Sequence, residues 1–353
     1  MTAARSTVVT VTNATGQVLG KAWQDLPHGI WSGGIEPAWT IGPGETVSWR
    51  TESNGVLTGT EGRVGYHIGD AGPIAELHWD NPYGGSNSYD EVCPPGWAML
   101  RGGGAGATTT VTWLLEPAQW HLTPFRPSTH GFRFPNSWPA GTTDTTIDLG
   151  LARLPIGDAS NGLCGGMVYA ALDYYMAGRS IPPQVVAPPG QGDPLFDFLV
   201  SRLFDSFDIP NLPARLFAIM EPAYPDTDGG VLEPVGLMSG RSAVMIREAW
   251  PNIKEWIDAG VPRPICLVKL KSLNPGDLGR NHQVLVWGYY VNGTGVALAL
   301  YDPNDPRDDT CSLWFDAART DVVVGVGTNP PDLGPVLCFL TTAYTPAQPP
   351  PGT

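Results

Sequence analysis

The first 118 residues alternate apolar and polar positions over short stretches that glycine and proline interrupt. Such alternation is typical of β-strands with one buried face, and this region has no helical period. Turn residues recur at fairly regular spacing, as they do in β-sandwiches. We expect strands at residues 8–11, 46–49, 63–68, 74–79 and 108–115, with a glycine-rich hairpin connection at 102–106.

After Pro155 the apolar positions fall three or four residues apart. The run from Met167 to Tyr175 has this helical spacing, and Gly178 follows it as a stop signal. Further helices are expected at 194–206 and 242–259, the second kinked or broken at Pro251. Strand patterns come last, at 265–271, 283–291, 296–301, 312–315 and 336–341. Helices followed by a sheet predict an α+β domain.

A chain of 353 residues is too long for one core, so we expect a multidomain protein. The patterns place an all-β sandwich at 1–118 and the α+β domain at 146–345. Residues 119–145 are irregular, and their aromatic side chains are too dense for a free tether. This linker is therefore expected to pack against the second domain. The proline-rich residues 346–353 are expected to be disordered.

Composition and charge limit the classes of partner that the protein is expected to bind. The 44 Gly and 36 Pro indicate many loops, while 13 Trp argue against disorder. The formal net charge is −14, and no cluster of Lys and Arg is present. Phosphate binding needs such clusters, so we expect no nucleic-acid partner and no strongly anionic lipid. A neutral lipid or a glycan is compatible with this charge.

Targeting signals and cysteine spacing are uninformative. No stretch approaches the roughly 20 apolar residues of a membrane span, and the sequence begins with a strand pattern rather than a signal core. The compartment is therefore open, either the cytoplasm or the outside through a non-classical route. Five cysteines without a CxxC pair indicate neither a disulfide framework nor a zinc site, and no cofactor is expected. Four of them are read as structural: Cys93, Cys266, Cys311 and Cys338.

The segments 58–66 and 77–89 resemble the aegerolysin family of small β-sandwich proteins. The resemblance covers about the first third of the chain and implies a module that recognises lipids or associates with membranes. Trp79 and Tyr83 would then be binding residues, because amphipathic rings suit a head-group boundary. The alternative is that Trp79, Pro82 and Tyr83 form a packed turn that holds the sandwich together.

Cys164 lies in the run Asn-Gly-Leu-Cys-Gly-Gly-Met, where a loop gives way to the first helix. The positive end of a helix dipole favours a thiolate, and a nearby imidazole would lower the pKa of the thiol further. His282 heads one predicted strand, and Asp302 closes the next in Tyr-Asp-Pro-Asn. These three residue types can act as nucleophile, general acid–base and orienting group. The glycine pair after Cys164 would give a substrate backbone close access.

The order of these three motifs resembles the compact papain-like cysteine peptidases of clan CA whose third catalytic residue is Asp. Residues 163–174 also resemble a group of uncharacterised bacterial proteins that share the Asn-His-Gln and Tyr-Asp-Pro-Asn elements. The resemblance implies a papain-like domain with catalytic Cys164, His282 and Asp302. It also implies a cysteine hydrolase, most simply a peptidase with a polypeptide substrate.

The oxyanion site departs from the papain pattern. The backbone N–H of Cys164 would be one donor. Papain-like enzymes usually supply the second donor from a Gln about six residues before the nucleophile, where this chain has Asp158. A carboxylate cannot stabilise an oxyanion unless it is protonated, so Asn161 is the candidate that replaces it.

Two alternatives concern the acid. If Gly293 and Thr294 form a two-residue hairpin turn, Asp302 faces away from His282, whereas an odd loop or one bulge would bring both to the same face. Asn304 is therefore the alternative orienting residue. The acidic run could instead bind calcium, but its spacing lacks the Gly and terminal Glu of a helix-loop-helix site, so no metal is expected. That run comprises Asp302, Asn304, Asp305, Asp308 and Asp309.

Three functions are consistent with these patterns. The first is a cysteine hydrolase that a lipid- or glycan-recognising sandwich brings to its target. The rival is a non-catalytic membrane-binding protein or toxin component whose papain-like half is an inert scaffold, and Asp158 favours it. The third is acyl transfer or deamidation by the same Cys164, His282 and Asp302.

Overall fold

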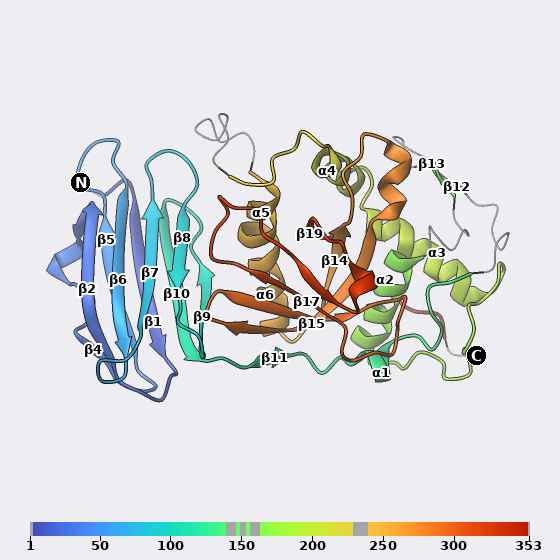
Figure 1. Cartoon of the computed structure of the whole chain (residues 1–353), viewed down its shortest axis with the longest axis horizontal. Coiled ribbons are helices and arrows are strands. Elements are labelled where there is room, and N and C mark those ends of the chain that lie inside the picture. Colours follow the sequence, from blue (N-terminus) through green and yellow to red (C-terminus); the bar gives the residue numbers. More distant parts are fainter. Residues whose placement is uncertain (1–2, 139–145, 149–152, 156–162, 229–238, 352–353) are drawn as a thin grey trace. The chain divides into compact units, whose positions relative to one another are not determined.

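The computed structural model describes residues 3–138, 146–148, 153–155, 163–228 and 239–351, and it is rich in β-sheet (Figure 1). The chain divides into two compact units. The first contains Met1–Trp120 together with Tyr290–Val296 and Asp316–Ala318. The second contains His121–Tyr289, Ala297–Phe315 and Arg319–Thr353.

The first unit consists of two five-stranded sheets that share one hydrophobic core. Strand β1 is parallel to β10 and antiparallel to β5. One sheet has the order β3-β5-β1-β10-β9, with β1 Ser6–Asn13, β3 Ile30–Trp31, β5 Thr46–Glu52, β9 Trp97–Gly103 and β10 Thr108–Pro117. The other has the order β4-β2-β6-β7-β8, with β2 Leu19–His28, β4 Thr40–Ile41, β6 Thr60–Ile68, β7 Ile74–Asn81 and β8 Ser88–Val92.

The core of this unit follows from the alternation of its strands. In β7 every second residue is buried, so Ala75, Leu77 and Trp79 point inward. Val9 and Val11 of β1 do the same from the opposite sheet. Burying the apolar face of each sheet against the other removes both faces from water, which is the main stabilising term.

The second unit is built on a sheet with the order β18-β17-β16-β15-β14-β19, and β11 also pairs with β15. Strand β14 is antiparallel to both β15 and β19. The strands are β11 Trp120–Leu122, β14 Arg263–Val268, β15 His282–Asn292, β16 Gly295–Tyr301, β17 Ser312–Asp316, β18 Gly327–Asn329 and β19 Cys338–Thr341. A separate two-stranded sheet joins β12 Thr146–Asp148 to β13 Arg153–Pro155.

Helices of the second unit precede most of its sheet in the sequence. Helix α2, Cys164–Met176, packs against α3, Pro194–Phe207, and Asp193 caps α3 by accepting a hydrogen bond from the Leu195 N–H. The others are α1 Pro127–His130, α4 Asn211–Met220, α5 Arg241–Ala243 and α6 Trp250–Asp258. A π-helical turn, Val244–Ala249, lies just before Pro251, whose missing N–H cannot continue an α-helical hydrogen-bond ladder.

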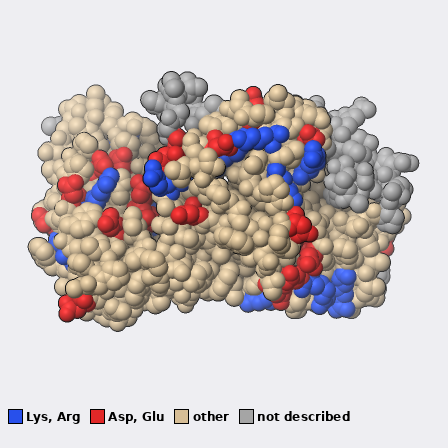
Figure 2. Space-filling view, in the orientation of Figure 1, with Lys and Arg blue, Asp and Glu red and all other residues tan. Residues whose placement is uncertain are grey.

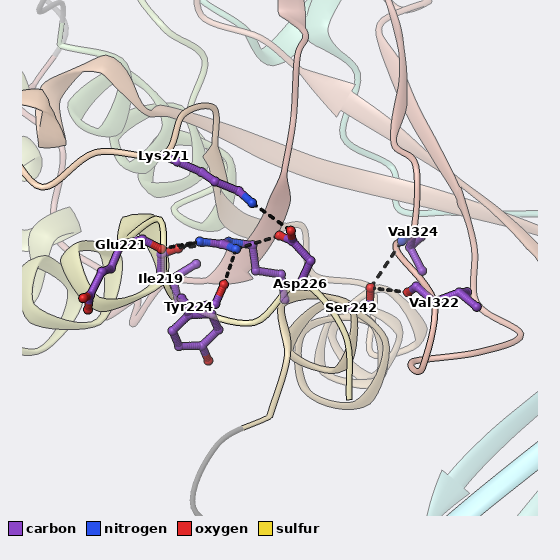
Figure 3. Close-up of polar contacts among 9 residues, drawn as sticks. Ile219, Glu221, Tyr224, Asp226, Ser242, Lys271, Val322 and Val324 are labelled. Carbon is purple, nitrogen blue, oxygen red and sulfur yellow. Dashed lines mark hydrogen bonds and ion pairs between the residues drawn. The ribbon is translucent and has the colours of Figure 1, made fainter. Parts of the chain in front are cut away.

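Arg241 joins α4 to the segment that follows it through acceptors on Ile219, Glu221, Tyr224 and Asp226, which Figure 3 labels. The residue is 1% exposed, and its side chain donates to the carbonyls of Ile219, Glu221 and Tyr224 and to the Asp226 carboxylate. Several backbone acceptors at the end of a helix are thereby satisfied by one cation. Nothing in the sequence around α4 predicted this helix, which carries Pro213 inside its first turn.

The C-terminal segment is ordered as far as Pro351, which corrects the prediction of a disordered tail at 346–353. The Ala347 N–H donates to Asp173 at 2.9 Å. Arg179 donates to the carbonyls of Pro349 and Pro350, each at 2.7 Å. These contacts compensate for the chain entropy lost on ordering a proline-rich strand without sheet partners. Residues 352 and 353 lie outside the described residues.

Within the described ranges, no helix is long and apolar enough to cross a membrane.

Candidate active site

Cys164 is the first residue of α2, at the amino end of a 13-residue helix. The first N–H groups of a helix have no intrahelical acceptor, and their dipoles converge on this end. The residue as a whole is partly exposed. The location predicted for the thiol from the loop-to-helix pattern is the one observed.

His282 and Asp302 meet beside it. His282 begins β15 and pairs with Leu267 of β14. Its Nε2 lies 2.7 Å from Oδ1 of Asp302, and the two residues are 7% and 3% exposed. The same carboxylate oxygen accepts the N–H of Asn304 at 2.8 Å. The N–H of Asn304 therefore holds the Asp302 carboxylate in position for its contact with the imidazole.

The expectation that strand parity turns Asp302 away from His282 is wrong. The hairpin does have two residues between Asn292 and Gly295, as that argument assumed. Asp302, however, lies beyond the last residue of β16, where the chain turns to form a bridge to Asp305. Outside the strand, the alternation of faces no longer fixes the direction of a side chain.

Asn304 does not take the orienting role that the parity argument left open to it. Asn304 is exposed, and its side-chain oxygen accepts a hydrogen bond from the Asn136 side chain at 3.2 Å. The contact with the His282 ring is made by Asp302 instead.

The thiol and the imidazole are also hydrogen-bonded to each other. Because Asp302 occupies Nε2, the ring nitrogen left for the sulfur is Nδ1. Burial alone would raise the pKa of Cys164, but the hydrogen bond and charge of His282 lower it. Backbone N–H groups of Gln283 and Gly165 add to that lowering.

The charges of the other two residues follow the same logic. Burial alone would lower the pKa of His282, but the negative charge of Asp302 and the hydrogen bonds to Asp302 and Cys164 raise it to about 10. Burial alone would raise the pKa of Asp302, and the His282 charge and hydrogen bond hold it below its usual range. All three shifts favour the ionised forms, a thiolate, an imidazolium and a carboxylate.

The glycines after Cys164 serve packing, which corrects the expectation that they open access for a substrate. A Cβ on Gly165 would lie 2.2 Å from Oγ of Ser206 and 2.8 Å from Nε2 of Gln283. A Cβ on Gly166 would lie 2.1 Å from the carbonyl oxygen of Leu199 in α3. Gly165 therefore lets α2 lie close to both α3 and β15, and Gly166 lets it lie close to α3.

Ser206 and Gln283 are site residues that the sequence reasoning missed. Gln283 donates from Nε2 to Ser206 at 3.1 Å, and Ser206 donates to the carbonyl of Leu203 at 2.8 Å. The two residues are 3% and 0% exposed. One signal was present: Ser206 continues the spacing of Leu199 and Leu203, so it lies on the apolar face of α3.

The second oxyanion donor stays a prediction, because Asn161 and Asp158 lie outside the described residues.

Trp79 is a core residue, which corrects its assignment as a ligand-binding residue and supports the packed alternative. Its side chain is 0% exposed, and its ring centroid lies 5.9 Å from that of Trp49 and 6.2 Å from that of Trp31. Its indole N–H donates to Thr51 at 3.0 Å. Tyr83 differs, because it is 43% exposed and remains accessible.

The remaining cysteines are buried, and burial raises the pKa of each thiol.

In the part of the chain that the structure describes, no group of three His, Cys, Asp or Glu side chains could hold a metal ion. In the acidic run, Asp309 accepts from the N–H and hydroxyl of Ser128, and Asp308 accepts from Thr310. Figure 2 shows acidic and basic side chains interspersed on one face.

Comparisons with known proteins give little. No protein-family model matches the sequence, and no curated protein matches it. Among solved structures, the chain is similar to one described as the lipid-binding protein Nakanori, with 16% identity and a TM-score of 0.28. The similarity covers 32% of this chain and 72% of that one.

Proposed function

We propose that the second unit is a papain-like cysteine hydrolase, most simply a peptidase. The observation that carries the proposal is the hydrogen-bonded series of Cys164, His282 and Asp302, with a partly exposed cysteine at one end and a buried carboxylate at the other. A buried His–Asp pair costs desolvation energy that packing alone does not repay, so its position beside a thiol with a lowered pKa supports a catalytic role.

The chemistry requires only these groups and water. The Cys164 thiolate attacks the substrate carbonyl carbon, and the oxygen takes up negative charge beside the Cys164 N–H. The His282 imidazolium gives its Nδ1 proton to the leaving amine as the carbon–nitrogen bond breaks, which leaves a thioester. Neutral His282 then takes a proton from water, whose hydroxide attacks the thioester. Release of the carboxylic acid restores the thiolate–imidazolium pair.

Asp302 acts through His282. Its carboxylate holds the ring so that Nδ1 faces the sulfur, and its charge stabilises the imidazolium that the first step requires. Because the acid is bound at Nε2, the ring is oriented in the opposite sense to the imidazole of a serine-protease triad.

Thiol labelling tests the proposal directly. With the native chain, we expect iodoacetamide to modify Cys164 well below pH 8, while Cys93, Cys266, Cys311 and Cys338 stay unmodified as internal controls. Peptide mapping by mass spectrometry would follow each site against pH. Cys164→Ala should abolish peptide hydrolysis with little change in Tm, because the loss of one sulfur atom leaves a small cavity.

Two results would count against the hydrolase. A Cys164 labelling rate and pH midpoint equal to those of a free cysteine would remove the nucleophile. Fast labelling together with no hydrolysis of any peptide in a mixed library would instead favour acyl transfer or deamidation by the same residues.

We further propose that the first unit brings the enzyme to a neutral lipid surface. The support is an apolar loop tip: Val56 is 90% exposed and Leu57 is 65% exposed. Tyr83 belongs to the neighbouring loop, because a Cβ on Gly59 would lie 2.8 Å from the Cα of Pro82. Adjacent exposed aliphatic side chains and an amphipathic ring suit insertion at a membrane interface. A glycan is the alternative target.

A further inference from the structure

The acid of the candidate site lies in a turn rather than in the sheet. Strand β16 ends at Tyr301, and Asp302 begins the turn that forms a bridge to Asp305. Strand pairing therefore does not fix the direction of the Asp302 carboxylate. The Asn304 N–H donates to that carboxylate at 2.8 Å. The position of Asp302 thus depends on what holds the peptide group between Pro303 and Asn304.

Asn136 holds this peptide group from outside the turn. Its N–H donates to the Pro303 carbonyl at 2.8 Å. The Pro303 carbonyl and the Asn304 N–H are the two polar ends of a single planar peptide unit. A donor at the carbonyl fixes the plane of this unit, so it also directs the N–H at the other end toward Asp302. The Asn136 side-chain amide adds a second contact, because its Nδ2 donates to Oδ1 of Asn304 at 3.2 Å.

The residue type at position 136 departs from its surroundings. Phe132, Phe134 and Trp138 are buried at alternate positions of this segment, and Asn136 occupies the remaining buried place in the same series. Its Oδ1 is buried without a hydrogen-bond partner among the described residues. A buried amide that is only partly satisfied costs free energy, and an apolar side chain would fit the pattern better. The contacts with the turn explain this asparagine better than stability does.

Other residues of this segment contact the same turn. The Ser128 N–H and hydroxyl donate to Asp309 at 2.8 and 2.6 Å. A Cβ on Gly131 would lie 2.2 Å from the carbonyl oxygen of Pro306. The segment therefore follows the turn from its far end toward Asp302, and Asn136 makes the contact at the peptide next to the carboxylate.

We propose that Asn136 is a positioning residue for Asp302 in the hydrolase reaction. Through the Pro303–Asn304 peptide it holds the Asp302 carboxylate in place. That carboxylate orients the His282 ring toward the Cys164 sulfur. The role of Asn136 rests on the function proposed above, and it adds to the site a residue from a segment that precedes α2.

Asn136→Leu tests this role in the full chain, with the pH profile of Cys164 labelling by iodoacetamide as the readout. Leucine has the branched skeleton of asparagine but no donor, so Tm should change little while the contact with Asn304 is lost. Labelling below the midpoint should slow by about twofold to tenfold, the factor that corresponds to one hydrogen bond. The N–H at 136 remains, so the loss should be smaller than in Asp302→Asn. Asn136→Ala repeats the test without added bulk.

A double variant separates positioning from a general loss of packing. If Asn136 acts through Asp302, adding Asn136→Leu to Asp302→Asn should slow labelling no further. Arg133→Ala is the matched control, because Arg133 is exposed in the same segment, and it should keep the native profile. The positive charge of Lys269 near Asp302 is retained in every variant.

Three results would overturn the role of Asn136: a native profile in both Asn136 variants, an equal effect of Arg133→Ala, or full additivity with Asp302→Asn. A native Cys164 that labels like a free cysteine would overturn the hydrolase and this role together. Slower labelling in Asn136→Leu, together with no hydrolysis of any peptide by the native chain, would reject the peptidase and support the role of Asn136. The two proposals can therefore fail separately.

Discussion

At the scale of single residues, the site shows which properties a sequence can reveal. Cys164, His282 and Asp302 were found because each follows a recognisable change from loop to helix or strand. Their contacts could not be derived, since the contact between His282 and Asp302 depends on a turn after Tyr301. The burial of Trp79 could have been predicted, because Trp79 shares its strand face with Ala75 and Leu77.

The Asp302 charge should set the reactivity of Cys164. In Asp302→Asn the ring can still be oriented, but the pKa of His282 falls without the negative charge. The pKa of Cys164 should then rise. At any pH below that pKa, the alkylation rate of Cys164 should drop about tenfold for each unit by which the pKa rises. The measurement is the pH profile of Cys164 labelling. Asp305→Asn, on an exposed neighbour, should leave the profile unchanged, and equal shifts in both variants would contradict the role of Asp302.

The folded-state pKa values also fix the pH window. The pKa of His282 is raised to about 10, so its pairing contributes fully below its unfolded pKa of about 6.5 and is lost as pH rises through 10. The pKa of Asp302 is lowered, so its contribution is full above about 3.9 and is lost as pH falls through the folded value. The pair therefore stabilises the fold most between about pH 4 and 6.5.

At the scale of elements, strands with regular alternation were predicted and irregular ones were missed. Strand β2 was missed because only one of its ten positions is buried and two register shifts interrupt its pairing with β6. Strand β9 buries three consecutive residues, from Ala98 to Leu100, so it shows no period of two. The role of Gly165 was also hidden, because it depends on contacts with α3 and β15 rather than on α2 itself.

For Gly165→Ala, helix propensity and side-chain packing predict opposite changes in stability. Helix propensity alone would make alanine more stabilising by about 1 kcal/mol. The contacts with Ser206 and Gln283 predict overpacking instead, with a loss of about 1–3 kcal/mol and a smaller preference of Cys164 for the thiolate. Thermal unfolding and Cys164 labelling would measure both. Adding Ser206→Ala removes the nearer clash and should restore part of the loss; a stabilised single variant would refute this packing.

At the scale of the whole molecule, two units of different character make one chain. The change from period-two to helical patterning predicted that division. The exact composition of the units was out of reach, because the first unit also takes Tyr290–Val296 and Asp316–Ala318 from far along the sequence. Long-range pairing of this kind leaves no local pattern.

Membrane targeting is testable in the intact chain with Leu57→Asn. Leu57 has φ of +61°, which costs a leucine more than an asparagine, so stability should hold or rise. Loss of an exposed leucine should reduce co-sedimentation with phosphatidylcholine vesicles by about tenfold. Val18→Asn, at another exposed aliphatic position, should bind as the native chain does. Failure of the native chain to bind vesicles would reject the lipid target.

Strand β15 runs without a break from His282 into the hairpin that belongs to the first unit. There the Asn292 side chain accepts the Gly96 N–H at 2.7 Å, and the Gly293 N–H donates to the Trp97 carbonyl at 2.8 Å. Cutting the protein after residue 118 would leave Gly96 and Trp97 in one fragment without these partners. In the other fragment the hairpin at Asn292, ten residues after His282, would lose its hydrogen bonds to the first unit. Gene dissection at that point would therefore damage both halves, and intact chains with single substitutions are the safer route to assigning each activity.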